Sequence, residues 1–442
     1  MYGKFPWINA AEARGGFKRC YCSQTVFALL CIALCTEALA GELGDVLHAT
    51  LQHPQIRAAS KLTEAAQAQV DAATGRYLGG ATVSAGWHQY EGQRIVGVFT
   101  PGTTMVPLIS ERISQAGVNY SLPVDVFGAI AANKERAGHD LHISDLLGRQ
   151  QALLKLHQAA NAYVTLQSLR AQQESLALSR KRVEATFQRV KKEFELGKAA
   201  GVDARYAESE VARLSADEAV LSGAVAQTQA DFAEATGQAG FLPKPMEIRV
   251  PAWEASPDAP LPVQIAQARQ MSAQAQAEES RRALLPSFSL DANFFRNNAQ
   301  NGDHRDTWAV GGVVSLPLGV TQYRQASAQR LTAAAAAEQR EAADRDAERQ
   351  LASLRAAYAS ALADAAAMDK EVAYREEVAR VEASMQQLGN QTLENLFRHE
   401  RDLLDARYRL AQSRARAATA WSAAQVIVGL PAETYITRMD AQ

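Results

Sequence analysis

Residues 117–125 read GVNYSLPVD, and residues 311–319 read GGVVSLPLG. Each stretch ends an alternating run of apolar and small or polar residues with Ser-Leu-Pro, first at 121–123 and again 194 residues later at 315–317. A second matching pair, Leu196-Gly197 and Leu388-Gly389, is separated by 192 residues. Matching features at nearly constant spacing indicate an internal duplication, so the chain is expected to contain two copies of one structural unit.

Four segments of this chain alternate in hydropathy with a period of two, two segments in each copy. They lie at about 81–90, 113–122, 287–296 and 308–317. Such alternation puts apolar side chains on one face of a strand and small or polar ones on the other, which is typical of transmembrane β-barrel strands. A half-buried sheet in a water-soluble protein shows the same pattern, and this alternative stays open at the level of the strands alone.

Proline positions predict long helices. No proline occurs between Pro123 and Pro243 or between Pro317 and Pro431. In the first of these stretches, apolar residues recur at the a and d positions of a heptad repeat, and the second shows the same spacing. The first set is Leu169, Leu176, Val183, Phe187, Val190 and Phe194, and the second is Tyr374, Val378, Val381, Met385 and Leu388. A continuous helix from about Ala129 to Leu196 would extend ~100 Å, so it must run alongside other helices.

Each long helix is expected to end in a turn that begins a second helix. Gly197 and Gly201 bracket the first turn, Gly389 marks the second, and the following helices end near Thr236 and Val428. The predicted organisation is a first repeat at 41–237, a proline-rich connector at 238–261, a second repeat at 262–430 and a C-terminal segment at 431–442. Within each repeat the order is helix, two strands, long helix and helix.

Residues 1–40 have the features of a secretory signal peptide. A basic flank at Lys18 and Arg19 precedes an apolar core at 26–35, and Ala38-Leu39-Ala40 is an A-x-A cleavage pattern. All four cysteines lie in this segment, at 20, 22, 31 and 35. Export with cleavage after Ala40 is the expectation, and a lipid-modified cysteine is the alternative. The mature chain then has no thiol for a disulfide, a metal site or a nucleophile.

The charge balance and the strands narrow the class of function. With 46 basic against 48 acidic residues, the chain lacks the basic excess of a nucleic-acid binder. Four strands cannot close a barrel, because small closed barrels need about eight, and open sheet edges cannot stand in lipid. Copies of the chain must therefore pool their strands, and three copies would supply twelve strands, enough for a barrel with a lumen. The expected fold class is α plus transmembrane β, with long helices continuing the barrel as a conduit.

The chain resembles the TolC-type outer membrane factors of bacterial tripartite efflux pumps and type I secretion systems. The resemblance spans nearly all of the mature chain and rests on the duplicated layout together with several segments. These are Leu51-Gln52-His53-Pro54-Gln55-Ile56 before an Ala-rich helix, the two Ser-Leu-Pro strand exits, Phe194-Glu195-Leu196-Gly197 with Asp203 six residues beyond its glycine, and Leu388-Gly389 leading into Leu393. It implies a homotrimer in the outer membrane with a periplasmic α-barrel, and an equatorial region built from 238–261 and 431–442. The implied partners are a periplasmic adaptor and an inner membrane pump, while a type I secretion conduit remains the alternative.

In this family the helical turns form the closable end of the channel, and the helix after the second turn commonly carries Asp-x-x-Asp. Here the corresponding residues are Asn395 and Arg398, with Glu394 beside them, so a doubly acidic gate does not carry over. Asp203 matches the equivalent acidic position in the first repeat. These four residues are the constriction candidates, and a solvated helix face without a gating role is the alternative reading. Pro123 and Pro317 mark the expected barrel-to-helix transitions.

Other candidates carry weaker signals. His139 and His142, near Asp140 and Asp145, have helical metal-ligand spacing, but plain surface histidines explain them better because one helix supplies too few ligands. Trp87, Tyr90, Phe294 and Trp308 are candidates for an aromatic belt at the membrane interface, with packing on a neighbouring strand as the alternative. No hydrolase, metalloprotease or phosphate-loop motif is present, so neither an enzyme nor a cofactor is expected. A purely structural periplasmic coiled coil would need neither the alternating segments nor the repeated Ser-Leu-Pro exits.

Overall fold

The computed structural model describes residues 42–97, 100–102, 104, 106–244, 248–253, 259–388 and 390–440. The predicted signal peptide at 1–40 and the turn residue Gly389 therefore lie outside the described residues. No helix among the described residues combines the length and the apolar character needed to cross a membrane.

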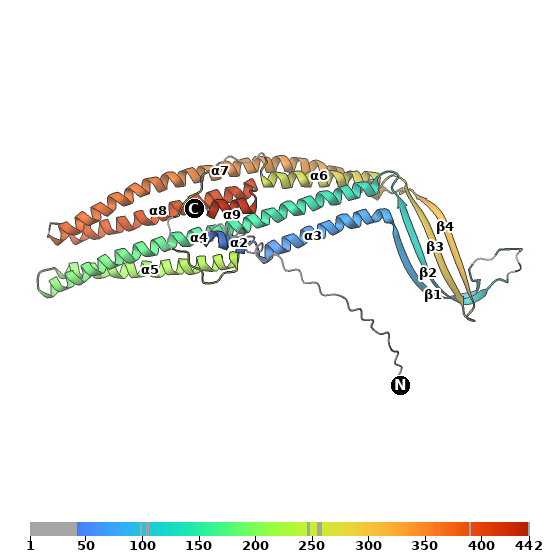
Figure 1. The fold of residues 1–442 in the computed structure, drawn as a ribbon, viewed down its shortest axis with the longest axis horizontal. Helices are drawn as coiled ribbons and strands as arrows, with labels where there is room; N and C mark the ends of the chain where they lie inside the picture. The colour runs from blue at the N-terminus through green and yellow to red at the C-terminus, as the bar shows by residue number, and fades with distance from the viewer. Residues whose placement is uncertain are drawn as a thin grey trace, which may run out of the picture. The chain divides into compact units, whose positions relative to one another are not determined.

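The two halves of the chain repeat one order of elements (Figure 1). The first half contains α2 (Glu42–Thr50), α3 (Pro54–Gly75), the 3-10 turn η1 (Arg76–Leu78), β1 (Gly80–Ile95), β2 (Ile109–Val124), α4 (Ala129–Glu195) and α5 (Gly201–Thr236). The second contains α6 (Leu261–Arg282), β3 (Ser287–Ala299), β4 (His304–Ser315), α7 (Val320–Gln387), α8 (Leu393–Val428) and the short C-terminal α9 (Ala432–Asp440). Helix, two strands, long helix and helix thus occur twice, as the duplication predicts.

The four strands form one antiparallel sheet in the order β1-β2-β3-β4. They are longer than predicted towards the strand-connecting loops, because β1 continues to Ile95 and β2 starts at Ile109. β4 begins at His304, opposite Asn298, and ends at Ser315, two residues before the predicted end. β4 extends to His304 because its backbone pairs with β3 that far. The hydropathy pattern of a single segment contains no information on such pairing.

The two Ser-Leu-Pro prolines differ in position. Pro317 lies between β4 and α7, as a strand exit should, whereas Pro123 is still paired in β2, opposite Ser289 of β3. β1 starts at Gly80, opposite Ser121, so β2 has no β1 partner at Pro123. Proline lacks a backbone N–H, and it is tolerated here because one side of the strand is already free.

The register aligns the apolar positions of all four strands on one face. One row consists of Val83, Val118, Phe294 and Trp308, and the row beside it of Ala81, Tyr120, Ala292 and Val310. The opposite face carries rows such as Thr82, Asn119, Asn293 and Ala309. In the single chain Val83 is 79% exposed and Trp308 74% exposed, so none of the described residues covers these positions of the apolar face.

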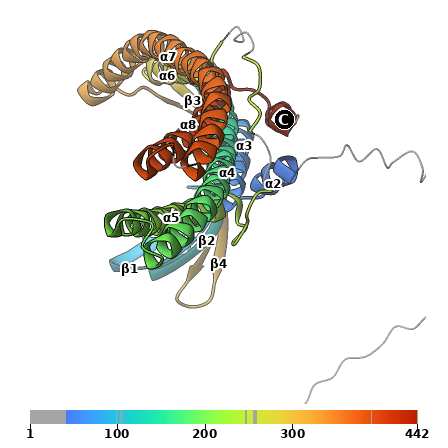
Figure 2. The same ribbon diagram turned by 90° about the vertical axis from the view of Figure 1, so that its left-hand side faces the viewer.

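The long helices lie side by side, with the short helices packed against their middle. Gly128, at φ +74°, precedes α4, and the Asp125 carboxylate accepts hydrogen bonds from the backbone N–H groups of Ile130 and Ala131. These contacts satisfy N–H groups in the first turn and set where the helix starts. Viewed along the helices, α2 and α9 lie on the convex side of the curved layer formed by α4, α5, α7 and α8 (Figure 2).

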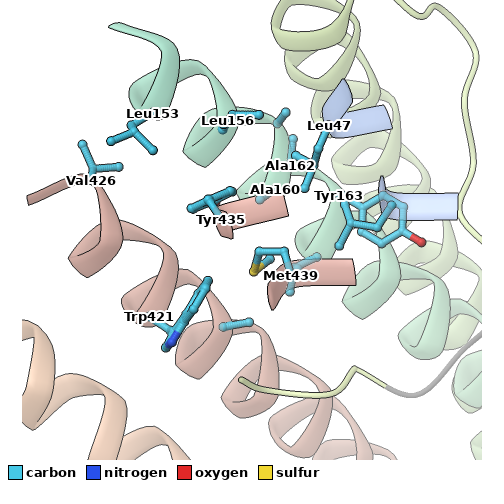
Figure 3. Packing of buried hydrophobic residues seen from close by; sticks show 14 of the residues in the cluster. Leu47, Leu153, Leu156, Ala160, Ala162, Tyr163, Trp421, Val426, Tyr435 and Met439 are labelled. Atoms are coloured by element: carbon cyan, nitrogen blue, oxygen red, sulfur yellow. The ribbon is translucent and has the colours of Figure 1, made fainter. Parts of the chain in front are cut away.

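The main hydrophobic core joins the short helices to the middle of the long ones (Figure 3). Trp421 of α8, Tyr435 of α9 and Leu47 of α2 are fully buried in it. The Trp421 indole N–H donates to the Ala252 carbonyl oxygen at 3.2 Å, so the connector is attached to the same core. Gly44 N–H donates to the Asp440 carboxylate at 2.7 Å, which joins the two ends of the described chain.

The two predicted heptad patterns have different outcomes. In α4, Leu176, Val183 and Val190 are buried against α5 and α8, as expected. In α7 the predicted pattern does not pack within the described chain, because Tyr374 is 63% and Val381 53% exposed. The buried side chains among the described residues of α7 are that of Tyr358 and those of five alanines, namely Ala336, Ala347, Ala361, Ala365 and Ala379. Alanines let the α7 and α8 axes approach closely, and this leaves the larger apolar residues facing outward.

Candidate channel site

The first helical hairpin turn is built around Gly197. This glycine has φ +71°, a left-handed conformation that closes α4, and Lys198 N–H donates back to the Glu193 carbonyl oxygen at 2.7 Å. A side chain at this φ would be strained, so glycine is required. Gly201 has a different role: it is the first residue of α5, where an added Cβ would lie 3.2 Å from the Phe194 ring.

Asp203 lies in the first turn of α5, one turn beyond the hairpin, and its side chain is exposed. Its backbone N–H donates to the Ala200 carbonyl oxygen at 3.0 Å. A carboxylate at a helix N-terminus is favoured by the partial positive charge of the unpaired N–H groups. The position thus keeps an exposed negative charge at the end of the hairpin.

The second hairpin presents a mixed cluster on the first turn of α8. Thr392 caps the helix by accepting a hydrogen bond from Asn395 N–H at 3.3 Å. Arg398 donates to the Asn395 side-chain oxygen at 2.9 Å and to Glu394 at 3.4 Å. Within the described part of one chain, Arg398 makes no ion pair with Asp203. The three candidates of α8 therefore interact with one another, and the structure does not join them to Asp203.

A second charged cluster lies further along the hairpins, and sequence reasoning missed it. Arg182 of α4 approaches the buried Glu400 of α8 at 2.8 Å, and Arg401 of α8 approaches Glu210 of α5 at 3.5 Å. Glu210 also pairs with Arg213 at 3.1 Å. Burial raises the pKa of the Glu400 carboxyl, while the charge of Arg182 opposes that rise. Only the Glu210–Arg213 spacing of three residues was visible in the sequence, because the other pairs join separate helices.

The histidine pair on α4 has ordinary surroundings. His139 lies 3.9 Å from Glu135 one turn earlier, and Asp140 pairs with Arg136 at 3.2 Å and accepts a hydrogen bond from Ser272. No group of three or more potential metal-binding side chains occurs among the described residues. The interpretation as surface histidines agrees with these contacts.

Three of the four aromatic belt candidates share the outward face of the sheet, whereas Tyr90 lies on the opposite face, where its ring is 6.0 Å from that of His88. Trp87, Phe294 and Trp308 are exposed on it, two of them in one row. Next to that row, Arg296 makes a two-point contact with Asp306, both distances being 2.9 Å. The row of Phe294 and Trp308 therefore lies between the apolar row that contains Val310 and the row of the charged pair, and aromatic residues are enriched at such positions near a membrane–water interface.

Comparison with known proteins agrees with this architecture. Residues 47–238, which run from α2 to just beyond α5, match the family described as outer membrane efflux protein. The match covers the first of the two repeats. No protein of curated function matches the sequence.

Solved structures share the fold of this chain over most of its length. The outer membrane protein VceC of Vibrio cholerae aligns with a TM-score of 0.73 at 17% identity, over 88% of this chain and 96% of VceC. The Campylobacter jejuni outer membrane channel CmeC gives 0.72 at 14% identity over 98% of both chains. The open state of the Neisseria gonorrhoeae channel MtrE gives 0.73 at 18% identity over 88% of both chains.

The family match over the first repeat and the fold confirm the resemblance to TolC-type factors and the fold class. The protein is an outer membrane efflux channel with a helical extension into the periplasm, and the family that its first repeat matches consists of transport proteins rather than enzymes. The soluble-sheet and coiled-coil alternatives are thereby excluded.

Proposed function

We propose that the chain works as a homotrimeric outer membrane channel that carries substrates from an inner membrane pump to the cell exterior. The observation that carries this proposal is the open four-stranded sheet with one uncovered apolar face. β1 and β4 each have one edge without a partner strand in the chain, and unpaired backbone groups are unfavourable in lipid. Three copies joined β4 to β1 would satisfy both edges in a twelve-stranded barrel.

The outward surface of α7 supports the same assembly. Tyr374, Val381 and Leu388 are 63%, 53% and 72% exposed in the single chain, although they recur every seven residues. An apolar heptad pattern that lacks an internal partner is well suited to a helix of a neighbouring copy. The helices would then close into a tube below the barrel.

The hairpin ends are suited to partner proteins. Leu196 and Val202 at the first turn are 70% and 77% exposed, beside Leu388 at the second. We assign this apolar end to docking of a periplasmic adaptor, which would connect the channel to the pump. Asp203, Glu394, Asn395 and Arg398 are our candidates for the constriction, and residues 238–261 and 431–442 for the equatorial region.

Light scattering of the detergent-solubilised protein tests the assembly. The mass after subtraction of bound detergent should be that of a trimer, and the protein should conduct ions in a planar bilayer. Val381→Glu should abolish the trimer, because it places a charge in the proposed contact between copies. Leu196→Glu, at an exposed apolar site outside that contact, should leave the trimer intact. A conducting wild-type monomer, or a Val381→Glu trimer as stable as the Leu196→Glu trimer, would refute the proposal.

A further inference from the structure

A groove of about 1000 Å³ lies between α4, α7 and α8. Its apolar lining comes from Leu169 of α4, Leu354 of α7 and several alanines, including Ala357 and Ala420. Volumes of this order accommodate drug-sized molecules. The groove is separate from the hairpin ends, because its lining residues belong to the middle of α4 and α7 and to the C-terminal half of α8.

The groove opens on the side of the helix layer that faces away from α2, α9 and the connector. On α8, Trp421 points to the connector through its hydrogen bond to Ala252, whereas Arg416 and Thr419 line the groove. At 100° per residue, Arg416 and Thr419 lie roughly 140° or more around the helix from Trp421. Since α2 and α9 are on the convex side of the layer (Figure 2), the groove is on the concave side. In a closed tube the concave side faces the lumen.

The polar rim of the groove presents hydrogen-bond donors. The Thr419 hydroxyl donates a hydrogen bond to the Asn161 side-chain oxygen at 2.7 Å. This bond orients the Asn161 amide, so that its N–H₂ group points away from Thr419. Arg416 lies three residues before Thr419, so the two share one helix face. The Arg416 side chain is exposed and forms no ion pair within the part of the chain that the structure describes.

The acidic residue of the lining is already engaged. Asp364 of α7 accepts a hydrogen bond from Ser413 of α8. Arg416 and Asp364 are the two charged residues among those that line the groove. The groove therefore combines an apolar floor, an oriented amide and one cation without a carboxylate partner.

We propose that this groove is a transit site for amphipathic organic anions on their way through the channel. The guanidinium of Arg416 would bind the carboxylate or sulfonate of the cargo, and Leu169, Leu354 and the alanines would contact its apolar body. The inference rests on the proposed function, because the groove is reached by cargo only if the concave side is the lumen.

Equilibrium dialysis of taurocholate against the protein in nanodiscs tests the site. Taurocholate is a suitable probe because it joins a rigid apolar body to a sulfonate. We expect Arg416→Gln to weaken binding about tenfold, the effect of losing one charge-assisted hydrogen bond. Ala357→Phe should abolish binding by filling the groove, and because Ala357 is exposed the variant should melt like the wild type.

Arg414→Gln is the matched control, since Arg414 is on the same helix but pairs with Asp369 and does not line the groove. It should bind taurocholate like the wild type. The inference is overturned if Arg416→Gln and Ala357→Phe bind normally, or if Arg414→Gln loses as much affinity as Arg416→Gln. Planar-bilayer conductance of the same preparation separates the two proposals: a conducting protein without a groove-dependent site refutes the transit site alone, whereas a protein that does not conduct refutes the channel.

Discussion

Replacing Arg182 with alanine should destabilise the helical hairpins more at pH 8 than at pH 5. The side chain of Glu400 is only 7% exposed, and Arg182 approaches it at 2.8 Å from another helix. Removing one partner of a buried ion pair leaves an uncompensated charge and costs about 3–5 kcal/mol. Arg182 is itself 44% exposed, so water screens part of its charge and we expect the lower end of that range, ~3 kcal/mol.

The sign of the pH dependence follows from the direction of the pKa shift. Burial raises the pKa of Glu400 in the folded protein, and loss of Arg182 removes a charge that opposes this rise. A raised folded pKa gives stability that is full below the unfolded pKa of about 4.5 and is lost as the pH rises through the folded pKa. The Arg182→Ala variant should therefore recover stability on acidification, when Glu400 takes up a proton.

Thermal melting followed by circular dichroism measures the effect. An unfolding entropy of ~2.1 cal/mol/K per residue over about 400 residues makes 1 kcal/mol equal to roughly 1 °C, so Tm should fall by ~3–4 °C at pH 8. Glu400→Gln keeps the shape of the side chain without its charge, and it should lose much less stability than Arg182→Ala. The double variant should be insensitive to pH between 5 and 8. Equal losses in both single variants, or a loss in Arg182→Ala that does not change with pH, would refute the reasoning.

Three further predictions concern other parts of the chain. Asp203→Lys should lower the cation preference of single channels, measured by reversal potential, if this carboxylate lines the constriction, whereas Arg180→Glu on the long helix should leave the preference unchanged. Gly117→Val should prevent barrel assembly in detergent extracts, because a Cβ at Gly117 would lie 2.2 Å from the Phe294 carbonyl oxygen, whereas Gly311→Ala, with open space at its Cβ, should assemble normally. Trp421→Ala should cost about 3–5 kcal/mol and lower Tm by several degrees, because the indole is fully buried; an unchanged melting curve would contradict the packing in Figure 3.

The candidate site could be predicted only in part. Gly197 was identified from its place after a heptad pattern, and its φ of +71° shows why glycine stands there. Asp203 and Arg398 were found by their spacing from the turns, and the spacing of four residues between Glu394 and Arg398 is compatible with the ion pair that the structure shows. The ion pair between Arg182 and Glu400 had no signal, since 218 residues separate partners that meet only when α4 packs on α8.

The sequence by itself determined the secondary structure that depends on interactions between residues close together in the chain. Absence of proline and heptad spacing predicted α4 within one residue of its observed end at Glu195, and period-two alternation predicted all four strands. These patterns depend on interactions between near neighbours, which a single chain segment contains. Tertiary structure alone decided which apolar surface of α7 is buried and how the strands are aligned in register. Alanines rather than Tyr374 and Val381 face α8, because the packing of two helices depends on the distance between their axes as well as on hydropathy.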